Sequence, residues 1–133
     1  MKKWLLLALI TALTTLLIAC GSSSEGGAAS NNAEPIEVSP EEIASGELEI
    51  IASNWKFDKE YYAIKAGEPI NVTVNSIDGV HGIEIRNTAY TNIINNKTTE
   101  VTIDEPGTYS IICSIPCGSG HRTMVSKLVV VEA

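Results

Sequence analysis

The sequence predicts an all-β domain, a Greek-key sandwich or barrel, on the strength of three observations. From residue 47 onward, short apolar or β-branched segments follow one another with turn signals roughly every 8 to 12 residues, the spacing typical of such folds. Ile70, Val72 and Val74 alternate with polar residues, which is the period of a half-buried strand. The chain has neither a helix–strand alternation nor a glycine-rich phosphate loop, and its 133 residues suffice for one domain but not for two.

The expected strands are separated by recognisable turns. The strands cover residues 48–52, 61–65, 70–75, 82–86, 91–95, 101–104, 109–113 and 124–131. Between them lie turn residues such as Gly67 and Pro106-Gly107, and glycine suits the positive φ that tight turns require. Ahead of the first strand, Ser39 and Pro40 favour a single helical turn, because serine caps a helix and proline suits its first position.

Residues 1–19 have the pattern of an export signal. Two lysines precede an apolar run from Trp4 to Ile18, which is about five residues shorter than the ~20 that a membrane-spanning helix needs. The run ends in Leu-Ile-Ala-Cys, which resembles the bacterial lipobox, in which the cysteine is acylated and becomes the new N-terminus. An ordinary signal peptide with an incidental cysteine is the alternative. We expect a lipoprotein signal peptide, lipidation at Cys20, and an extracytoplasmic protein that is lipid-anchored to the bacterial cell membrane.

Residues 20–46 are predicted to be the lipidated cysteine and a flexible tether, followed by the domain at residues 47–133. From residue 21 to 34 the composition falls to glycine, serine, alanine and asparagine with two acids, which cannot bury enough apolar surface to fold.

The net charge excludes one class of partner. The formal charge of the chain is −7, and removal of residues 1–19 with their two lysines leaves seven basic against 16 acidic residues, a net of −9. A nucleic-acid binder would need a basic face, whereas an acidic domain favours a cationic partner or a metal.

The chemistry lies in the last predicted turn, Cys-Ser-Ile-Pro-Cys-Gly-Ser-Gly-His-Arg-Thr-Met, residues 113–124. Once Cys20 is lipidated, Cys113 and Cys117 are the two remaining thiols, and a disulfide is the simplest interpretation for an exported chain. A disulfide does not account for His121 and Met124 in the same loop. Thiolate, imidazole and thioether are soft or borderline donors, a mixture that selects copper over magnesium or calcium.

The string Cys-x3-Cys-Gly-x-Gly-His-x2-Met, with the lone upstream histidine His81, resembles the binuclear copper A (CuA) domain of cytochrome c oxidase subunit II. The version in ba-type oxidases looks like the closer relative, and the resemblance runs from about residue 50 to 132. It implies a cupredoxin-like fold. The ligands that it implies for two copper ions are the bridging thiolates of Cys113 and Cys117, the imidazoles of His81 and His121, the thioether of Met124 and the backbone carbonyl of Ile115.

The sequence departs from this family in two places. The family usually has Glu or Gln where this chain has Ile115, although a backbone carbonyl ligand does not depend on the side chain. Subunit II also normally carries one or two N-terminal membrane helices, and this chain has the leader instead.

The resemblance implies a one-electron carrier rather than an enzyme in its own right. The donor would be a c-type cytochrome or another cationic protein, and the resemblance also suggests heme–copper oxidase subunit I as a partner. Trp55 resembles the aromatic segment through which electrons enter the family's site, with an ordinary core tryptophan as an equal alternative. Two other functions stay open: a copper-delivery or copper-storage lipoprotein, and a mononuclear blue-copper carrier with Cys113 idle. An electron carrier needs no substrate position, and we assign no catalytic residue.

Overall fold

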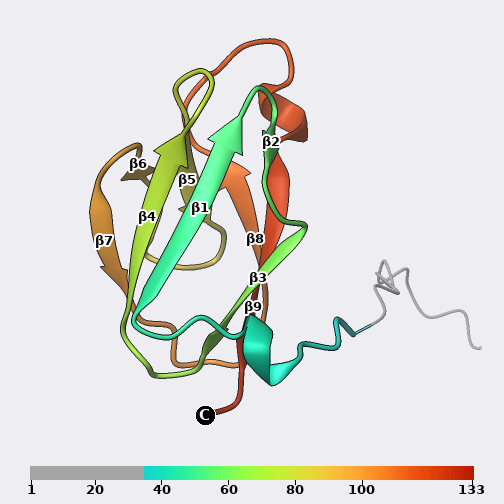
Figure 1. Ribbon diagram of the computed structural model, residues 1–133, viewed down its shortest axis with the longest axis vertical. Coiled ribbons are helices and arrows are strands. Elements are labelled where there is room, and N and C mark those ends of the chain that lie inside the picture. Colours follow the sequence, from blue (N-terminus) through green and yellow to red (C-terminus); the bar gives the residue numbers. More distant parts are fainter. Residues whose placement is uncertain (1–34) are drawn as a thin grey trace, which may run out of the picture. The chain divides into compact units, whose positions relative to one another are not determined.

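Two β-sheets pack face to face in the computed structural model, which describes residues 35–133 (Figure 1). The strands are β1 (Glu47–Ser53), β2 (Lys56–Phe57), β3 (Tyr61–Lys65), β4 (Ile70–Ser76), β5 (Gly82–Ile85), β6 (Ile93–Ile94), β7 (Thr98–Val101), β8 (Gly107–Cys113) and β9 (Val125–Val131). One sheet has the order β2-β1-β4-β7 and the other β3-β9-β8-β5-β6. The β1–β4 and β3–β9 pairs are parallel, and the other strand pairs are antiparallel. The all-β prediction is confirmed. The proposed signal peptide, Cys20 and the first part of the tether lie outside the described residues.

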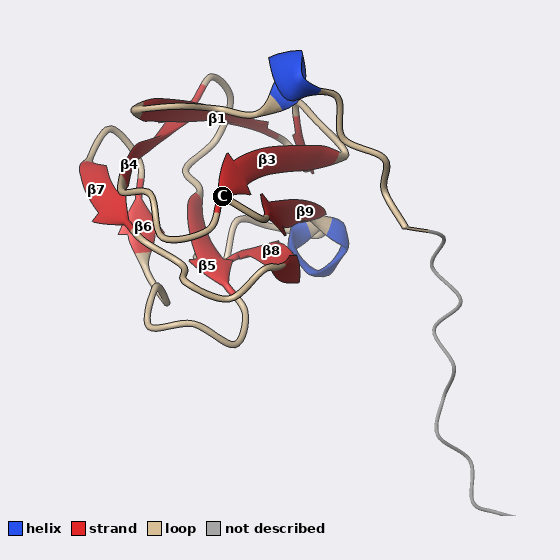
Figure 2. Ribbon diagram, turned by 90° about the horizontal axis from the view of Figure 1, so that it is seen from below, coloured by secondary structure: helices blue, strands red, loops and turns tan. Residues whose placement is uncertain are grey.

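The core forms where the inward faces of the two sheets meet. In β4, Ile70, Val72 and Val74 are buried while the residues between them are exposed or half-buried, as the alternation predicts. Ile83 of β5 and Ile111 of β8 face them from the second sheet and are fully buried. Burial of each such side chain stabilises the fold by about 1.5–3 kcal/mol. Seen from below, the sheets curl around this core (Figure 2).

One expected strand lies earlier in the chain than predicted. The sequence favoured residues 101–104, but β7 ends at Val101. Ile103 is still buried, so the alternation holds, yet the next residues leave the sheet. The reason is a side chain: the Tyr90 hydroxyl accepts a hydrogen bond from the Thr102 N–H and donates one to its carbonyl. These bonds satisfy the backbone without a partner strand.

The segment before β1 lies against the second sheet. A single 3-10 turn, η1 (Pro40–Glu42), begins after Ser39, whose backbone N–H and hydroxyl both donate to the Glu42 carboxylate. Glu42 also accepts a hydrogen bond from the Tyr61 hydroxyl, and Ile43 bridges to Ala63 of β3. The predicted helical turn is therefore present, and the last residues of the predicted tether contact the domain. Among residues 35–133, no helix is long and apolar enough to cross a membrane.

Three loops gather at one end of the two sheets, at the top of Figure 1. They are the turn between β1 and β2, the loop of residues 77–81 between β4 and β5, and the loop of residues 114–124 between β8 and β9. The last contains the second 3-10 turn, η2 (His121–Thr123). Antiparallel pairing of β8 with both β5 and β9 brings the ends of these loops together.

Candidate metal centre

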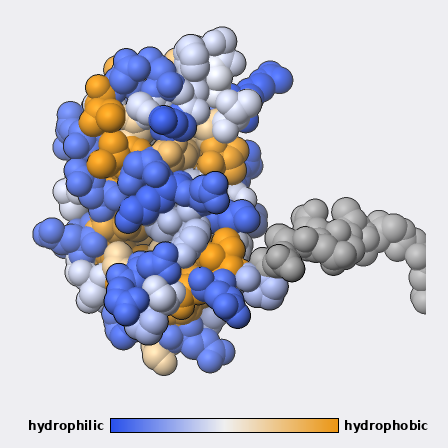
Figure 3. Space-filling view, turned by 45° about the vertical axis from the view of Figure 1, so that its right-hand side comes forward, coloured by the Kyte–Doolittle hydropathy of each residue, from blue (hydrophilic) through white to orange (hydrophobic). Residues whose placement is uncertain are grey.

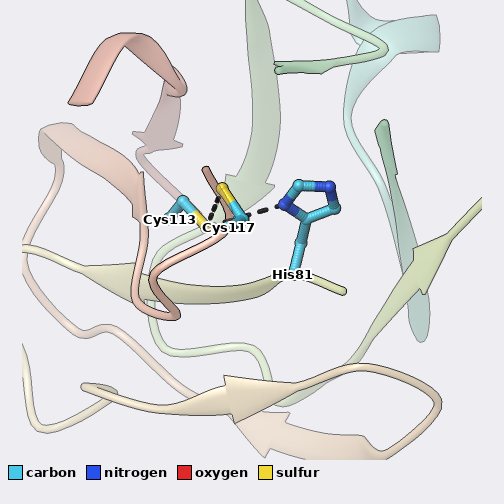
Figure 4. A group of neighbouring side chains, drawn as sticks. All are labelled: His81, Cys113 and Cys117. Atoms are coloured by element: carbon cyan, nitrogen blue, oxygen red, sulfur yellow. Dashed lines mark hydrogen bonds between the residues drawn. The ribbon is translucent and has the colours of Figure 1, made fainter. Parts of the chain in front are cut away.

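Cys113 and Cys117 lie at the centre of this end of the molecule. Cys113 is the last residue of β8 and is buried, and Cys117 is half-buried in the loop that follows. Their Sγ atoms are 3.7 Å apart. Figure 4 shows the two thiols pointing toward each other with the imidazole of His81 beside them. One donor atom from each of these three residues lies within 4.8 Å of the other two.

Two further donors lie near the sulfur of Cys113. The Nδ1 atom of His81, which stands one residue before β5, is 3.8 Å from Cys113 Sγ. The backbone carbonyl oxygen of Ile115 is 3.2 Å from the same sulfur. The Ile115 side chain lies against Gly82, where a Cβ would come within 3.0 Å of Ile115 Cδ1. The side chain of Ile115 therefore packs along the chain beside His81, and its carbonyl turns toward the thiol.

A second pair of donors lies near the sulfur of Cys117. His121 Nδ1 is 3.7 Å from Cys117 Sγ, and Met124 Sδ is 3.6 Å from it. The η2 turn produces this arrangement, because it places His121 and Met124 one short turn apart, with the Met124 N–H donating to the His121 carbonyl. Met124 is 1% exposed, so its thioether faces inward.

The tautomer of His81 is fixed by its surroundings. Its Nε2 lies 2.9 Å from the carbonyl oxygen of Asp78, which can only accept a hydrogen bond. In the neutral imidazole, Nε2 therefore carries the proton and donates it, and Nδ1 keeps its lone pair on the side of the two sulfurs. Ser76 holds the same residue from behind, since its hydroxyl accepts a hydrogen bond from the His81 N–H. His81 is fully buried, and donation of the second ring N–H to a backbone carbonyl is the usual way in which a metal-ligating histidine is oriented.

The spacing of these atoms fits a soft metal. Metal–sulfur bonds of about 2.3 Å and metal–nitrogen bonds of about 2.0–2.1 Å are typical of such sites. The pairwise distances from the two Cys sulfurs, 3.2 to 3.8 Å, are shorter than the sum of two such bonds, so one ion can touch both atoms of each of these pairs. Two thiolates, two imidazoles and a thioether are donors that favour copper.

Burial raises the pKa of the Cys117 thiol, and the neighbouring Cys113 thiol raises it further. Without a metal, Cys117 is thus protonated at neutral pH. Metal binding displaces this proton, because the thiolate is the ligand.

Trp55 lies in the β1–β2 turn above the same loop. Its indole Nε1 donates a hydrogen bond to the Cys117 carbonyl oxygen over 3.0 Å, and the residue is 40% exposed. Of the two interpretations that the sequence left open, the core one is therefore wrong. Trp55 is therefore exposed to solvent and at the same time hydrogen-bonded to the backbone of Cys117.

The structure brings all six predicted ligand positions together. Sequence reasoning missed two contributors: the carbonyl of Asp78, which orients His81, and Asn54, whose amide lies close to Gly79. Backbone carbonyls leave no mark in a sequence. The signal for Asn54 is indirect, a glycine in the loop before His81.

Comparison with known proteins supports the same interpretation. No family model matches the chain. It is 28% identical over 86 residues to cytochrome c oxidase subunit 2 of Thermus thermophilus, an alignment that covers 62% of this chain and 64% of that protein. A chain of a heme–copper terminal oxidase dimer, solved by cryo-electron microscopy, is 28% identical with a TM-score of 0.55, and 98% of each chain is covered.

Two more distant structures share the fold. The periplasmic domain of cytochrome oxidase subunit II from Bradyrhizobium japonicum has 18% identity and a TM-score of 0.54, covering 65% of this chain and 83% of that one. Reduced auracyanin from Roseiflexus castenholzii has 20% identity and a TM-score of 0.51, covering 66% of this chain and 98% of that one.

These structures show that the domain has a cupredoxin-like fold, and the His/Cys/Cys cluster together with the similarity to oxidase chains supports copper as its metal. More narrowly, the domain is similar to the CuA-type domain of cytochrome c oxidase subunit II.

Proposed function

We propose that the domain holds two copper ions in a binuclear CuA centre and carries single electrons. One observation carries the proposal: the donors divide into two equivalent sets around a pair of thiols. His81 and the Ile115 carbonyl lie beside Cys113, while His121 and Met124 lie beside Cys117. Each set supplies one imidazole and one weak donor. The two sulfurs are 3.7 Å apart, which is close enough for each thiolate to bind both copper ions.

The chain's contribution is to hold these donors still. Copper held by these residues would supply one-electron redox chemistry. The sheets fix Cys113, the Asp78 carbonyl fixes the ring of His81, and burial fixes Met124. His81 and Met124 are almost fully buried, so water is excluded from their side of the site. Ligands held in this way need not rearrange when the charge of the site changes, and transfer stays fast.

Trp55 is the proposed point of electron entry. Its indole is exposed at one face and hydrogen-bonded to the Cys117 carbonyl at the other, so a partner that touches the ring is one hydrogen bond from a bridging cysteine. Figure 3 shows a surface of mostly hydrophilic side chains interrupted by apolar patches. Three of the exposed large apolar residues, Trp55, Ile77 and Val80, lie in the loops at the metal end.

We further propose that Cys20 anchors the domain to the outer face of the cell membrane by lipid, and that a c-type cytochrome or another cationic protein donates the electron. The net charge of −9 after removal of the leader supports a cationic donor. The similarity to oxidase chains supports heme–copper oxidase subunit I as the partner that receives the electron. The chain aligns with only 64% of the curated subunit 2, and that protein's assembly is therefore part of the proposal.

A copper titration of the reduced, metal-free protein tests the centre. The proposal predicts two ions per chain and a purple colour, and a mononuclear blue-copper site would instead take one ion and show an intense blue band. Cys113→Ser should leave at most one ion, with Cys117, His81, His121 and Met124 as its remaining donors. Cys117→Ser should weaken binding more, because His121 and Met124 both lie beside that sulfur. Tight Cu(I) that exchanges with a chelator and never shares an electron would favour copper delivery or storage.

A further inference from the structure

The turn between β1 and β2 contacts both loops that carry the donors. Its two residues, Asn54 and Trp55, are adjacent in the chain but contact different loops. Trp55 lies on the loop of residues 114–124, which we call the cysteine loop. Asn54 lies on the loop of residues 77–81, which we call the His81 loop.

The indole of Trp55 packs against two glycines of the cysteine loop, Gly118 and Gly120. A Cβ on Gly120 would stand 2.4 Å from Trp55 Cγ and 2.5 Å from its Cβ, and one on Gly118 would stand 3.1 Å from its Nε1. Distances under 3.0 Å do not occur for real Cβ atoms, so the ring occupies the space that a side chain at position 120 would need. The hydrogen bond from Nε1 to the Cys117 carbonyl fixes the ring in this place.

Asn54 meets the His81 loop in the same manner. A Cβ on Gly79 would stand 2.5 Å from Asn54 Oδ1 and 2.9 Å from His81 Nε2. The amide of Asn54 and the ring of His81 therefore flank a glycine that has φ of +80°. This φ belongs to the turn in which the Asp78 carbonyl accepts the hydrogen bond from His81 Nε2.

We propose that Asn54 and Trp55 are positioning residues, which hold the His81 loop and the cysteine loop at a fixed separation, with Gly79, Gly118 and Gly120 as the surfaces that receive them. The base of the two loops is already joined, because the Ser114 N–H donates to the Gly82 carbonyl over 3.0 Å. The β1–β2 turn adds a second connection, from His81 across to Cys117 and Gly120. Two contacts restrict the relative position of the two loops more than one contact does. A metal whose ligands come from both loops binds best when those ligands are already in place.

This inference goes beyond the entry of electrons at Trp55, and its copper measurements rest on the proposed centre. A residue that only passes electrons changes the transfer rate when it is replaced. A residue that positions the loops also changes the ring of His81 in the metal-free protein and the spectrum of the loaded protein.

Two glycine variants, each with a matched control, test the proposal in the full chain. Gly79→Ala is compared with Gly46→Ala, since Gly46 has nearly the same φ of +76° but nothing within 4 Å of its Cβ position. Gly120→Ala, at a position with φ of −94°, is compared with Ser119→Ala, its exposed neighbour. In the copper-free chain, the nuclear magnetic resonance signal of the His81 Nε2 proton is recorded. In the loaded chain, the copper hyperfine splitting and the rate of copper loss to a chelator are measured.

We expect Gly79→Ala to shift or broaden the His81 ring signal, and Gly120→Ala to release copper about 10-fold faster or more, the usual size of an effect on ligand orientation. Both controls should match the wild type in the ring signal, the hyperfine splitting and the chelator rate. Trp55→Ala should also speed copper loss, because it removes the indole and its hydrogen bond to the Cys117 carbonyl. Asn54→Ala, at an exposed residue, should alter the His81 signal even if Gly79→Ala fails to fold.

The proposal is overturned if both glycine variants and Asn54→Ala match their controls in the ring signal, the hyperfine splitting and the chelator rate. Failure of the binuclear centre itself has a different signature, since the wild type would then bind one copper ion while the ring signal of the copper-free variants still responds.

Discussion

The Sγ atoms of Cys113 and Cys117 lie 3.7 Å apart, one at the end of a strand and the other four residues on in a loop. This separation comes from the β8–β9 connection, which bends back after Ile115 so that the second thiol faces the first. Each thiol has its own imidazole within 3.8 Å, His81 for Cys113 and His121 for Cys117. In the proposed binuclear centre, both cysteines would therefore serve as ligands.

Met124→Leu should keep the copper and raise the midpoint potential. The thioether is a weak donor that tunes a copper site more than it holds it, and its loss removes electron density that favours the oxidised state. Because leucine has a similar volume, the substitution should cost less than about 1.5 kcal/mol of unfolding free energy. Voltammetry on the loaded variant gives the potential, and loss of both ions would show that Met124 is an essential ligand instead.

Electron transfer from a cationic cytochrome should slow as salt rises. The mature chain is predicted to carry a net charge of −9, and the Debye length falls to ~8 Å near physiological ionic strength, which screens long-range attraction. Stopped-flow rates at low and high salt measure the effect. A rate that does not depend on salt would point to apolar docking around Trp55, where Ile77 and Val80 are also exposed.

Tyr62→Phe should remove part of the pH dependence of stability. Burial raises the pKa of Tyr62 well above 10, and the hydrogen bond that its hydroxyl donates to Asp58 raises it further. The folded state therefore keeps a proton that the unfolded chain loses above pH 10. Stability from this residue is complete below pH 10 and falls by about 1.4 kcal/mol per pH unit above it.

The comparison uses chemical denaturation of wild type and variant between pH 7 and pH 11. At neutral pH the variant should be less stable by about 1.5–3 kcal/mol, the usual value of a hydrogen bond to a charged group. The difference between the two proteins should shrink above pH 10. Parallel curves at all pH values would mean that Tyr62 ionises equally in both states.

Cys20→Ala should separate anchoring from copper binding. The lipobox predicts that this cysteine receives the lipid, while the candidate ligands begin at His81. The variant should leave the membrane fraction or keep its leader, which mass spectrometry of the N-terminus detects, and its copper content should equal that of the wild type. A drop in bound copper would show that Cys20 also serves the metal centre.

Much of the fold was predictable because it depends on local patterns. The alternation in residues 70–75 marks β4, and glycine and proline mark the turns between strands. The strand predicted at 101–104 was misplaced because the Tyr90 hydroxyl satisfies the backbone of Thr102, and nothing in the local pattern reveals a bond between residues 12 apart.

The donors of the candidate site were also visible in the sequence, but their arrangement was not. Residue type and spacing point to His121 and Met124, whereas the division of six donors between two sulfurs depends on how the loops meet in space. The same holds for Trp55, whose exposure depends on a loop more than 60 residues away that has no Cβ at positions 118 and 120.

The most direct test of the binuclear assignment is electron paramagnetic resonance of the oxidised, copper-loaded wild type. One unpaired electron shared equally by two copper nuclei gives a seven-line hyperfine pattern, and the Cys113→Ser variant should lose it. A four-line pattern from a wild-type protein that holds a single copper ion would contradict the account.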